Sequence, residues 1–157
     1  MDVLAFFNWL DASWLASISK AYGGVFAVVQ MFHLLSLALL GGAVLVADLR
    51  LLNVLMADIS NHVVQTNTKK LFGWALIVVT LSGIFMSSAV AMKLYYNEMF
   101  WAKMTALSIG VLFFYFIRTP LLKKVEEVDA WTLRSVAIAS LITWFTVAAS
   151  GRWIGFS

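Results

Sequence analysis

The stretch AYGGVFAVVQMFHLLSLALLGGAVLVA, residues 21–47, is apolar over enough length to cross a membrane. The hydrocarbon core of a bilayer is about 30 Å thick and needs roughly 20 apolar residues per helix. The stretch lacks the alternation of a membrane strand, and lipid offers no partners to open backbone groups, so we expect a helix. His33 lies near its middle. An ionisable ring at membrane depth marks a site by default.

Three further segments, residues 71–92, 97–117 and 131–150, are also long and apolar enough to span a bilayer. The chain is 62% hydrophobic and 12% charged, with a mean hydropathy of +0.91, which excludes an ordinary soluble domain. We therefore predict an all-α integral membrane four-helix bundle, with residues 1–157 as one membrane domain. The chain has no cysteine, which excludes disulfides and thiolate metal sites.

The first nineteen residues differ from the spanning segments because polar residues interrupt them. Leu4, Phe7, Leu10, Trp14 and Ile18 recur at spacings of three and four, which predicts one apolar face of a helix. A secretory signal peptide is not expected, because the segment has no basic beginning. We predict an amphipathic helix over residues 1–19 that lies flat in the membrane interface.

The distribution of lysine and arginine predicts the orientation. One side of the predicted bundle receives Arg50, Lys69, Lys70, Arg118, Lys123, Lys124 and Arg134, whereas the other receives Lys20, Lys93, Lys103 and Arg152. Cytoplasmic loops carry the excess of positive charge, so both termini are expected outside. The net charge of +3 is spread over helix ends and gives no indication of a nucleic-acid partner.

Helical geometry, at about 100° per residue, predicts which positions look inward. The expected inward faces are, from the first to the fourth spanning helix, Gly23, Gln30, His33, Gly41 and Asp48; Gly73, Thr80, Gly83 and Ser87; Lys103, Ala106, Gly110 and Phe114; and Ser140, Trp144 and Gly151. Small residues on such faces let helices approach closely in lipid. His33 is then expected near the midplane, with Lys103 and Arg152 nearer the outer surface.

This arrangement has a chemical interpretation. Histidine in a helix bundle is an axial ligand for haem iron, so His33 is the candidate metal ligand. Lys103 and Arg152 are the candidate partners of the haem propionates. Met86 and Met104 are candidates for a sixth ligand by their depth, since a thioether can complete the coordination of haem iron.

Structural roles remain open for the same residues. His33 can hydrogen-bond Thr80 or Ser87 across a helix interface. Lys103 can extend its ammonium to the outer interface. Arg152 can anchor the last helix at the headgroups. Asp48 and Arg50 can cap the first spanning helix at the cytoplasmic surface as an ion pair, and His62 is expected to be solvated.

Several pieces of sequence form a recognisable set. They are Phe32-His33-Leu34, Gly41-Gly42, Asp48-Leu49-Arg50-Leu51-Leu52, Gly73, Thr80-Leu81-Ser82-Gly83, Asn97-Glu98-Met99-Phe100-Trp101-Ala102-Lys103-Met104 and Gly151-Arg152-Trp153-Ile154. Over most of its length the chain resembles an uncharacterised bacterial family of small four-helix integral membrane proteins. That resemblance implies a bacterial inner membrane as the location.

A more distant resemblance rests on the order of a histidine, two small residues, an arginine and then Trp-x-Lys opening a later helix. This order is similar to that of the membrane protoporphyrinogen oxidases and the copper-resistance-type membrane proteins. In the oxidases a histidine in that position is thought to bind haem b, and a lysine in the later helix is needed. The resemblance implies these roles for His33 and Lys103. The rest of the oxidase motif is not seen in this sequence.

Three functions follow as hypotheses. The first is a b-type haem-binding redox protein or redox-complex subunit. The second is a non-catalytic accessory or oligomer-forming membrane subunit, with the lipid bilayer and a homo-oligomer or larger complex as partners. The third is a small solute or proton carrier that uses His33, Gln30 and Asp48. No catalytic residue is assigned, because the sequence has neither a nucleophile beside a base nor a glycine-rich phosphate loop.

Overall fold

The computed structural model describes residues 2–156, which are almost entirely helical and contain no strand. Four helical segments in this part of the chain are long and apolar enough to cross a membrane: Gly23–Leu51, Asn61–Ala89, Glu98–Leu122 and Ala130–Phe156. The prediction of an all-α four-helix membrane protein is therefore confirmed.

The spanning segments are built from α3 (Gly23–Leu51), α4 (Asn61–Ala89), α6 (Glu98–Leu112) and α8 (Ala130–Trp153). The third segment continues beyond α6 through a π-helical stretch, η1 (Phe113–Arg118), and the short α7 (Thr119–Leu122), whereas the fourth ends in the 3-10 turn η2 (Ile154–Phe156). A π turn is rare and often lies at a functional site. This one carries two buried side chains, Phe114 and Arg118.

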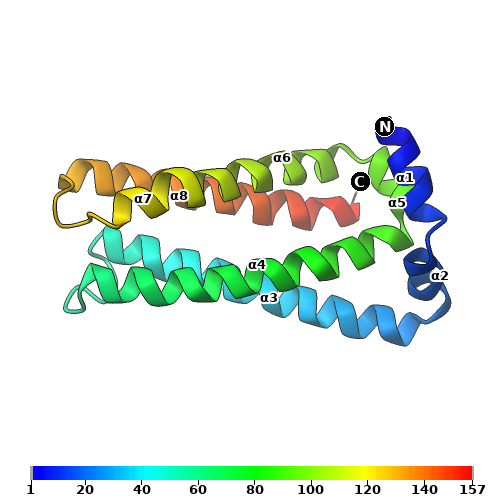
Figure 1. Ribbon diagram of the computed structural model, residues 1–157, viewed down its shortest axis with the longest axis horizontal. Helices are drawn as coiled ribbons and strands as arrows, with labels where there is room; N and C mark the ends of the chain where they lie inside the picture. The colour runs from blue at the N-terminus through cyan, green and yellow to red at the C-terminus, as the bar shows by residue number, and fades with distance from the viewer. Residues whose placement is uncertain (1, 157) are drawn as a thin grey trace.

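Figure 1 shows the helices as two antiparallel hairpins, α3 with α4 and α6 with α8, that lie along one another. The two hairpins are joined chiefly where α3 contacts α8. One end of the bundle holds both termini, and we call it the terminal end. The opposite end holds the connections at residues 52–60 and 123–129, and we call it the basic end because most of the lysines and arginines lie in these connections or in the helix ends beside them.

Aromatic packing fills the centre of the bundle. The rings of Phe72 on α4 and Phe114 on η1 stack with centroids 3.8 Å apart, and Trp144 on α8 meets Phe72 edge-on at 5.2 Å. Leu40 and Val44 of α3 complete this core. All four spanning segments therefore meet in one apolar cluster, which fixes the two hairpins against each other.

The second spanning helix begins at Asn61, ten residues before the predicted start at position 71. Ser60 caps it by accepting a hydrogen bond from the backbone N–H of Val63 at 3.3 Å. The segment predicted from continuous apolar residues omits this beginning, because the first turns of α4 are polar but still helical. These turns carry Gln65 and Lys69 at the basic end, beyond the apolar part of α4.

The N-terminal segment forms two helices, α1 (Val3–Asp11) and α2 (Trp14–Ala21), where a single helix was predicted. The break falls at Ser13, whose hydroxyl caps α2 through the N–H of Ala16. Because the break resets the helical phase, the predicted face does not continue into α2, where Trp14 is 70% exposed and Ser19 is buried. Within α1 the prediction holds for Phe7 and Leu10, which are buried.

The predicted inward face of α3 is only partly correct. His33 and Asp48 are buried, whereas Gly23, Gln30 and Gly41 are exposed. The remaining buried positions of this helix are Ser36, Leu40, Ala43, Val44, Ala47, Arg50 and Leu51. Helices in lipid are apolar on every side, so a stripe of small residues does not by itself tell the inner face from the outer one. With Gln30 turned outward, the polar path from His33 through Gln30 to Asp48 is not assembled.

Candidate functional site

His33 lies at the contact between α3 and α4, in the half of α3 nearer the terminal end, and its side chain is 8% exposed. The ring packs on Gly83 of α4, where an added Cβ would meet His33 Cε1 at 3.4 Å. Its Nδ1 lies 2.8 Å from the hydroxyl of Ser82. The sequence predicted Thr80 or Ser87 as this partner. That prediction is wrong, because Ser82 rather than Thr80 faces α3.

The hydrogen bonds of Ser82 determine the tautomer of His33. A hydroxyl has one proton to donate. Ser82 Oγ lies 2.5 Å from the carbonyl of Val78 and 3.3 Å from that of Val79, and neither oxygen can donate. The hydroxyl proton therefore goes to a carbonyl, and Nδ1–H of His33 donates to Ser82. This assignment follows from the hydrogen-bond network. The backbone of Val79 also interacts with the ring. With the proton on Nδ1, Nε2 carries the lone pair, and no hydrogen bond joins Nε2 to another side chain among residues 2–156.

The ammonium of Lys103 interacts electrostatically with the His33 ring. Its side chain is half-buried and crosses Gly151 on α8, where an added Cβ would lie 3.4 Å from Nζ. No hydrogen bond or ion pair to Lys103 occurs within residues 2–156. The structure thus brings together an unpaired cation and a histidine with a free lone pair.

The other residues predicted for this site differ in burial. Met86, on α4, and Met104, on α6 directly after Lys103, are both half-buried. Arg152 is exposed in the last turn of α8, with its guanidinium 4.5 Å from the ring centroid of Phe156. No hydrogen bond or ion pair in the described part of the chain connects Arg152 with His33 or Lys103.

An open groove lies between α4 and α6, displaced from His33 and Lys103 towards the basic end. It has a volume of about 410 Å³ and is lined by Leu76, Thr80, Leu107, Ser108, Val111 and Leu112. Thr80 and Ser108 donate their hydroxyl protons to carbonyls of their own helices. The groove is therefore an apolar surface, because both hydroxyls that line it are engaged within their own helices.

A second polar centre, which the sequence did not predict, is buried near the basic end. Arg118 Nη2 donates to Asp48 Oδ1 at 2.7 Å and to Gln65 Oε1 at 3.1 Å. The amide of Gln65 in turn donates to the carbonyl of Ala47 at 2.9 Å. Ser140 of α8 lies beside the Asp48 carboxylate. All four spanning segments contribute to this centre, which therefore holds the two hairpins together.

The expected pairing of Asp48 with Arg50 is wrong. Arg50 donates from Nε to the carbonyl of Ile59 at 2.7 Å and from Nη1 to the side chain of Asn53 at 2.7 Å. It therefore closes the loop after α3, while Asp48 turns inward. The only sequence signal for the Asp48–Arg118 pair was that a carboxylate and a guanidinium both lie near the basic ends of their helices.

A metal centre built from protein ligands alone has no support in residues 2–156, because this part of the chain contains no cluster of three histidine or carboxylate side chains. Haem is different because the porphyrin supplies four nitrogen ligands, and the protein needs to add only one or two. The donor set here, one imidazole nitrogen with a fixed tautomer, fits that requirement. Fixing one ring nitrogen by a hydrogen bond orients the other for a metal.

Together, the fold and these two polar centres define a small helical membrane protein with a histidine–lysine site formed by His33 of one hairpin and Lys103 of the other. Residues 6–157 match the model of a family of unknown function, DUF6644, and the chain belongs to that family. This confirms that the chain belongs to an uncharacterised family. No curated protein and no solved structure matches it, so the comparisons add nothing to the more distant resemblance to protoporphyrinogen oxidases.

Proposed function

We propose that this protein binds haem b in the membrane and serves as a redox protein or as a subunit of a redox complex. The observation that carries this proposal is the fixed tautomer of His33. Ser82 holds the proton on Nδ1, and Nε2 keeps a lone pair to which no described side chain donates a hydrogen bond. His33 is the proposed axial ligand. Haem bound there supplies one-electron transfer.

Lys103 and the groove support the same proposal. Partial burial of an ammonium without a carboxylate partner carries a desolvation cost, and an anionic ligand group relieves that cost. Haem is an apolar macrocycle with two carboxylates at one edge. The groove between α4 and α6 offers apolar surface, and Lys103 lies on α6 one turn before Leu107, the first residue of that helix to line the groove. Lys103 is the proposed partner of one propionate, and Arg152 of the other.

A second axial position is proposed for a methionine. Met86 lies one turn of α4 beyond Ser82, and Met104 lies on α6 beside Lys103. These residues come from the two helices that flank the groove. A thioether opposite an imidazole raises the reduction potential of haem iron, so a methionine ligand predicts a higher potential than a second nitrogen ligand.

The test is the reduced-minus-oxidised absorption spectrum of the purified protein after expression in haem-replete cells. The wild type is expected to show a Soret band and an α band, and His33→Ala to lose both. His62→Ala is the matched control, since His62 is the one other histidine and is exposed. The control should keep both bands. A colourless wild type, or bands that survive in a folded His33→Ala variant, overturns the proposal.

The location is proposed to be a bacterial inner membrane, crossed so that both termini face outward. Both termini lie at the same end of the bundle (Figure 1). The opposite, basic end carries the excess of lysine and arginine, and such excess favours the cytoplasmic side. With this orientation the histidine–lysine site lies in the outer half of the membrane.

Assembly into a homo-oligomer or a larger membrane complex is a second candidate function, favoured by Gly41 and Gly42 on α3. Both are exposed, and a Cβ built on either would have no atom within 4 Å. Paired small residues on a lipid-facing side let a second helix approach closely. Light scattering in detergent tests this candidate: the double variant Gly41→Leu/Gly42→Leu should be monomeric where the wild type is not. A monomeric wild type contradicts it.

A further inference from the structure

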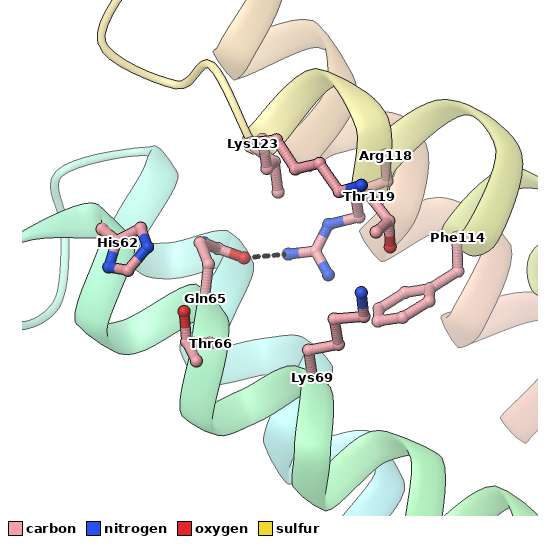
Figure 2. Close-up of a pocket in the computed structure, with 9 residues that line it drawn as sticks. His62, Gln65, Thr66, Lys69, Phe114, Arg118, Thr119 and Lys123 are labelled. Carbon is pink, nitrogen blue, oxygen red and sulfur yellow. Dashed lines mark hydrogen bonds between the residues drawn. The ribbon is translucent and has the colours of Figure 1, made fainter.

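A pocket with cationic walls opens near the basic end, between α4 and the η1–α7 stretch. It has a volume of about 240 Å³. Its polar lining consists of His62, Gln65, Thr66 and Lys69 from α4, and of Arg118, Thr119 and Lys123 from the other wall. Figure 2 shows Lys69 extending from α4 towards the Arg118 guanidinium and Lys123 crossing the opposite wall of the pocket.

The charges of this pocket are unbalanced. The pocket is lined by three cationic side chains, those of Lys69, Arg118 and Lys123. No carboxylate lines it. The Asp48 carboxylate, which Arg118 Nη2 engages, is fully buried and does not line the pocket. Like charges gathered in this way repel one another unless an anion lies between them.

The hydrogen bonding of Arg118 is a second and independent indication that the pocket binds an anion. Its side chain is only 3% exposed, yet Nε is a buried donor with no hydrogen-bond partner. Buried donors are nearly always satisfied, so an orphan of this kind needs an explanation such as a missing ligand. Among residues 2–156 only Nη2 of this guanidinium is engaged, by Asp48 and Gln65. The remaining nitrogens are free for an acceptor in the pocket.

The depth of the pocket indicates the source of that acceptor. Its α4 wall is formed by residues 62–69, and the apolar part of the same helix begins only at Leu71. The pocket therefore lies where the apolar span ends, at the level of the lipid headgroups. Phe114 and Leu122 add apolar lining beside the cations. A group with a negative phosphate and an attached apolar chain matches both features.

We propose that this pocket binds the phosphate of an anionic phospholipid. Lys69 and Lys123 form ion pairs with the phosphate oxygens, and Arg118 donates to them from nitrogens that Asp48 and Gln65 leave free. Thr66 and Thr119 add hydroxyl donors at the rim. Basic pockets between membrane helices are known as headgroup sites, because each lysine or arginine adds attraction to anionic lipid. This site is separate from the histidine–lysine site and does not depend on haem.

Native mass spectrometry of the detergent-purified protein tests the proposal, with phosphatidylglycerol and phosphatidylcholine as probes. The wild type should retain phosphatidylglycerol in preference to phosphatidylcholine. The variant Lys69→Gln/Lys123→Gln should bind phosphatidylglycerol at least about tenfold more weakly. Both side chains are exposed, so these changes should leave the fold intact.

The neighbouring lysines provide the matched control. Lys70→Gln/Lys124→Gln removes the same charge from adjacent positions that do not line the pocket. This control should bind phosphatidylglycerol with an affinity within about twofold of the wild type. Such a change is smaller than the one expected from the loss of one charged contact. An equal loss in both double variants means general surface attraction and overturns the proposal. Occupation of the pocket by inorganic phosphate in place of lipid also overturns the assignment to a phospholipid.

Discussion

Arg118 and Asp48 form an ion pair with 2.7 Å between Nη2 and Oδ1, although 70 residues separate them in the sequence. The two side chains are 3% and 0% exposed. Gln65 accepts a second hydrogen bond from the same nitrogen. The π-helical η1 carries Arg118 into this position, so an irregular turn in the third spanning segment supplies the partner of a carboxylate in the first.

Removing one member of this pair should destabilise the fold strongly. Asp48→Asn leaves the Arg118 charge buried without its counter-ion, and we expect the free energy of unfolding to fall by about 3–5 kcal/mol. Reversible unfolding of the detergent-solubilised protein measures this change. The control is Lys124→Gln, which removes an exposed ion pair of 3.7 Å and should change the free energy by no more than about 1 kcal/mol.

Replacing both members by apolar residues should be less damaging than removing one. In Asp48→Leu/Arg118→Met no charge is left buried, and such replacements are often neutral. The double variant should therefore be more stable than Asp48→Asn in the same unfolding measurement. If it is the less stable of the two, the pair itself contributes net stability beyond the satisfaction of its charges.

Ser82 is predicted to matter for haem through His33. Ser82→Ala removes the acceptor that holds the proton on Nδ1, so the ring can rotate or take the other tautomer. Changes of this kind lower metal affinity by about 10-fold to 100-fold. Haem titration of the apoprotein, followed by the Soret band, measures the affinity.

Thr68→Ala is the matched control for this prediction. Thr68 lies on the same helix away from the groove, and its hydroxyl bonds only the carbonyls of Val64 and Gln65. Its loss should leave haem affinity unchanged. Equal affinities in Ser82→Ala and the wild type would show that Ser82 does not hold the ring for a ligand.

The proposed orientation can be tested with single cysteines, because the chain has none of its own. Asn8→Cys on α1 and Glu126→Cys in the loop before α8 replace exposed residues at opposite ends of the bundle. In intact cells a membrane-impermeant maleimide should label the cysteine at position 8 and not that at position 126. The reverse pattern would place the basic end outside and contradict the orientation.

We expect Asp129, the N-cap of α8, to make the stability of the protein slightly dependent on pH. Its carboxylate accepts hydrogen bonds from the backbone N–H of Thr132 at 2.9 Å and from the Thr132 hydroxyl at 2.8 Å. These bonds, the backbone one first, lower the pKa of Asp129 below its usual range. Because the pKa is lower in the folded state, the stabilisation is present above the unfolded value of about 3.9 and is lost as the pH falls through the folded value.

The melting temperature of Asp129→Asn measures this contribution against the wild type. Asparagine also caps helices, so the variant keeps a neutral cap and loses only the charge. The wild type should melt higher near neutral pH, and the difference should narrow as the pH falls below about 4. A difference that is independent of pH would mean that the ionised carboxylate adds nothing.

The sequence predicted the number and approximate position of the spanning helices because long apolar segments have only one stable form in lipid. It also marked His33 and Lys103, since ionisable groups are rare at that depth. The predicted faces of the third and fourth helices agree with burial at Gly110, Trp144 and Ser140. Between these helices Gly110 faces Trp144, and an added Cβ at Gly110 would lie 3.4 Å from the indole.

The residues that surround those marked groups were not predictable in the same way. Ser82 is one of several hydroxyl residues on α4, and Thr68, Thr80 and Ser88 bond carbonyls of their own helix in the same way. Arg118 looked like an ordinary cation at a helix end, where most lysines and arginines extend to the interface. Its burial depends on the π turn and on Asp48 and Gln65 from two other helices.

By itself, the sequence determined that this protein is a four-helix membrane protein with one histidine inside. Hydrophobic length and the cost of unpaired backbone in lipid are properties of the chain alone. Only the tertiary structure decided which sides of the helices meet, that Ser82 orients His33, and that Asp48 pairs with Arg118. The reason is physical: in a membrane every side of a helix is apolar, so its rotation is set by close packing and a few long-range polar contacts.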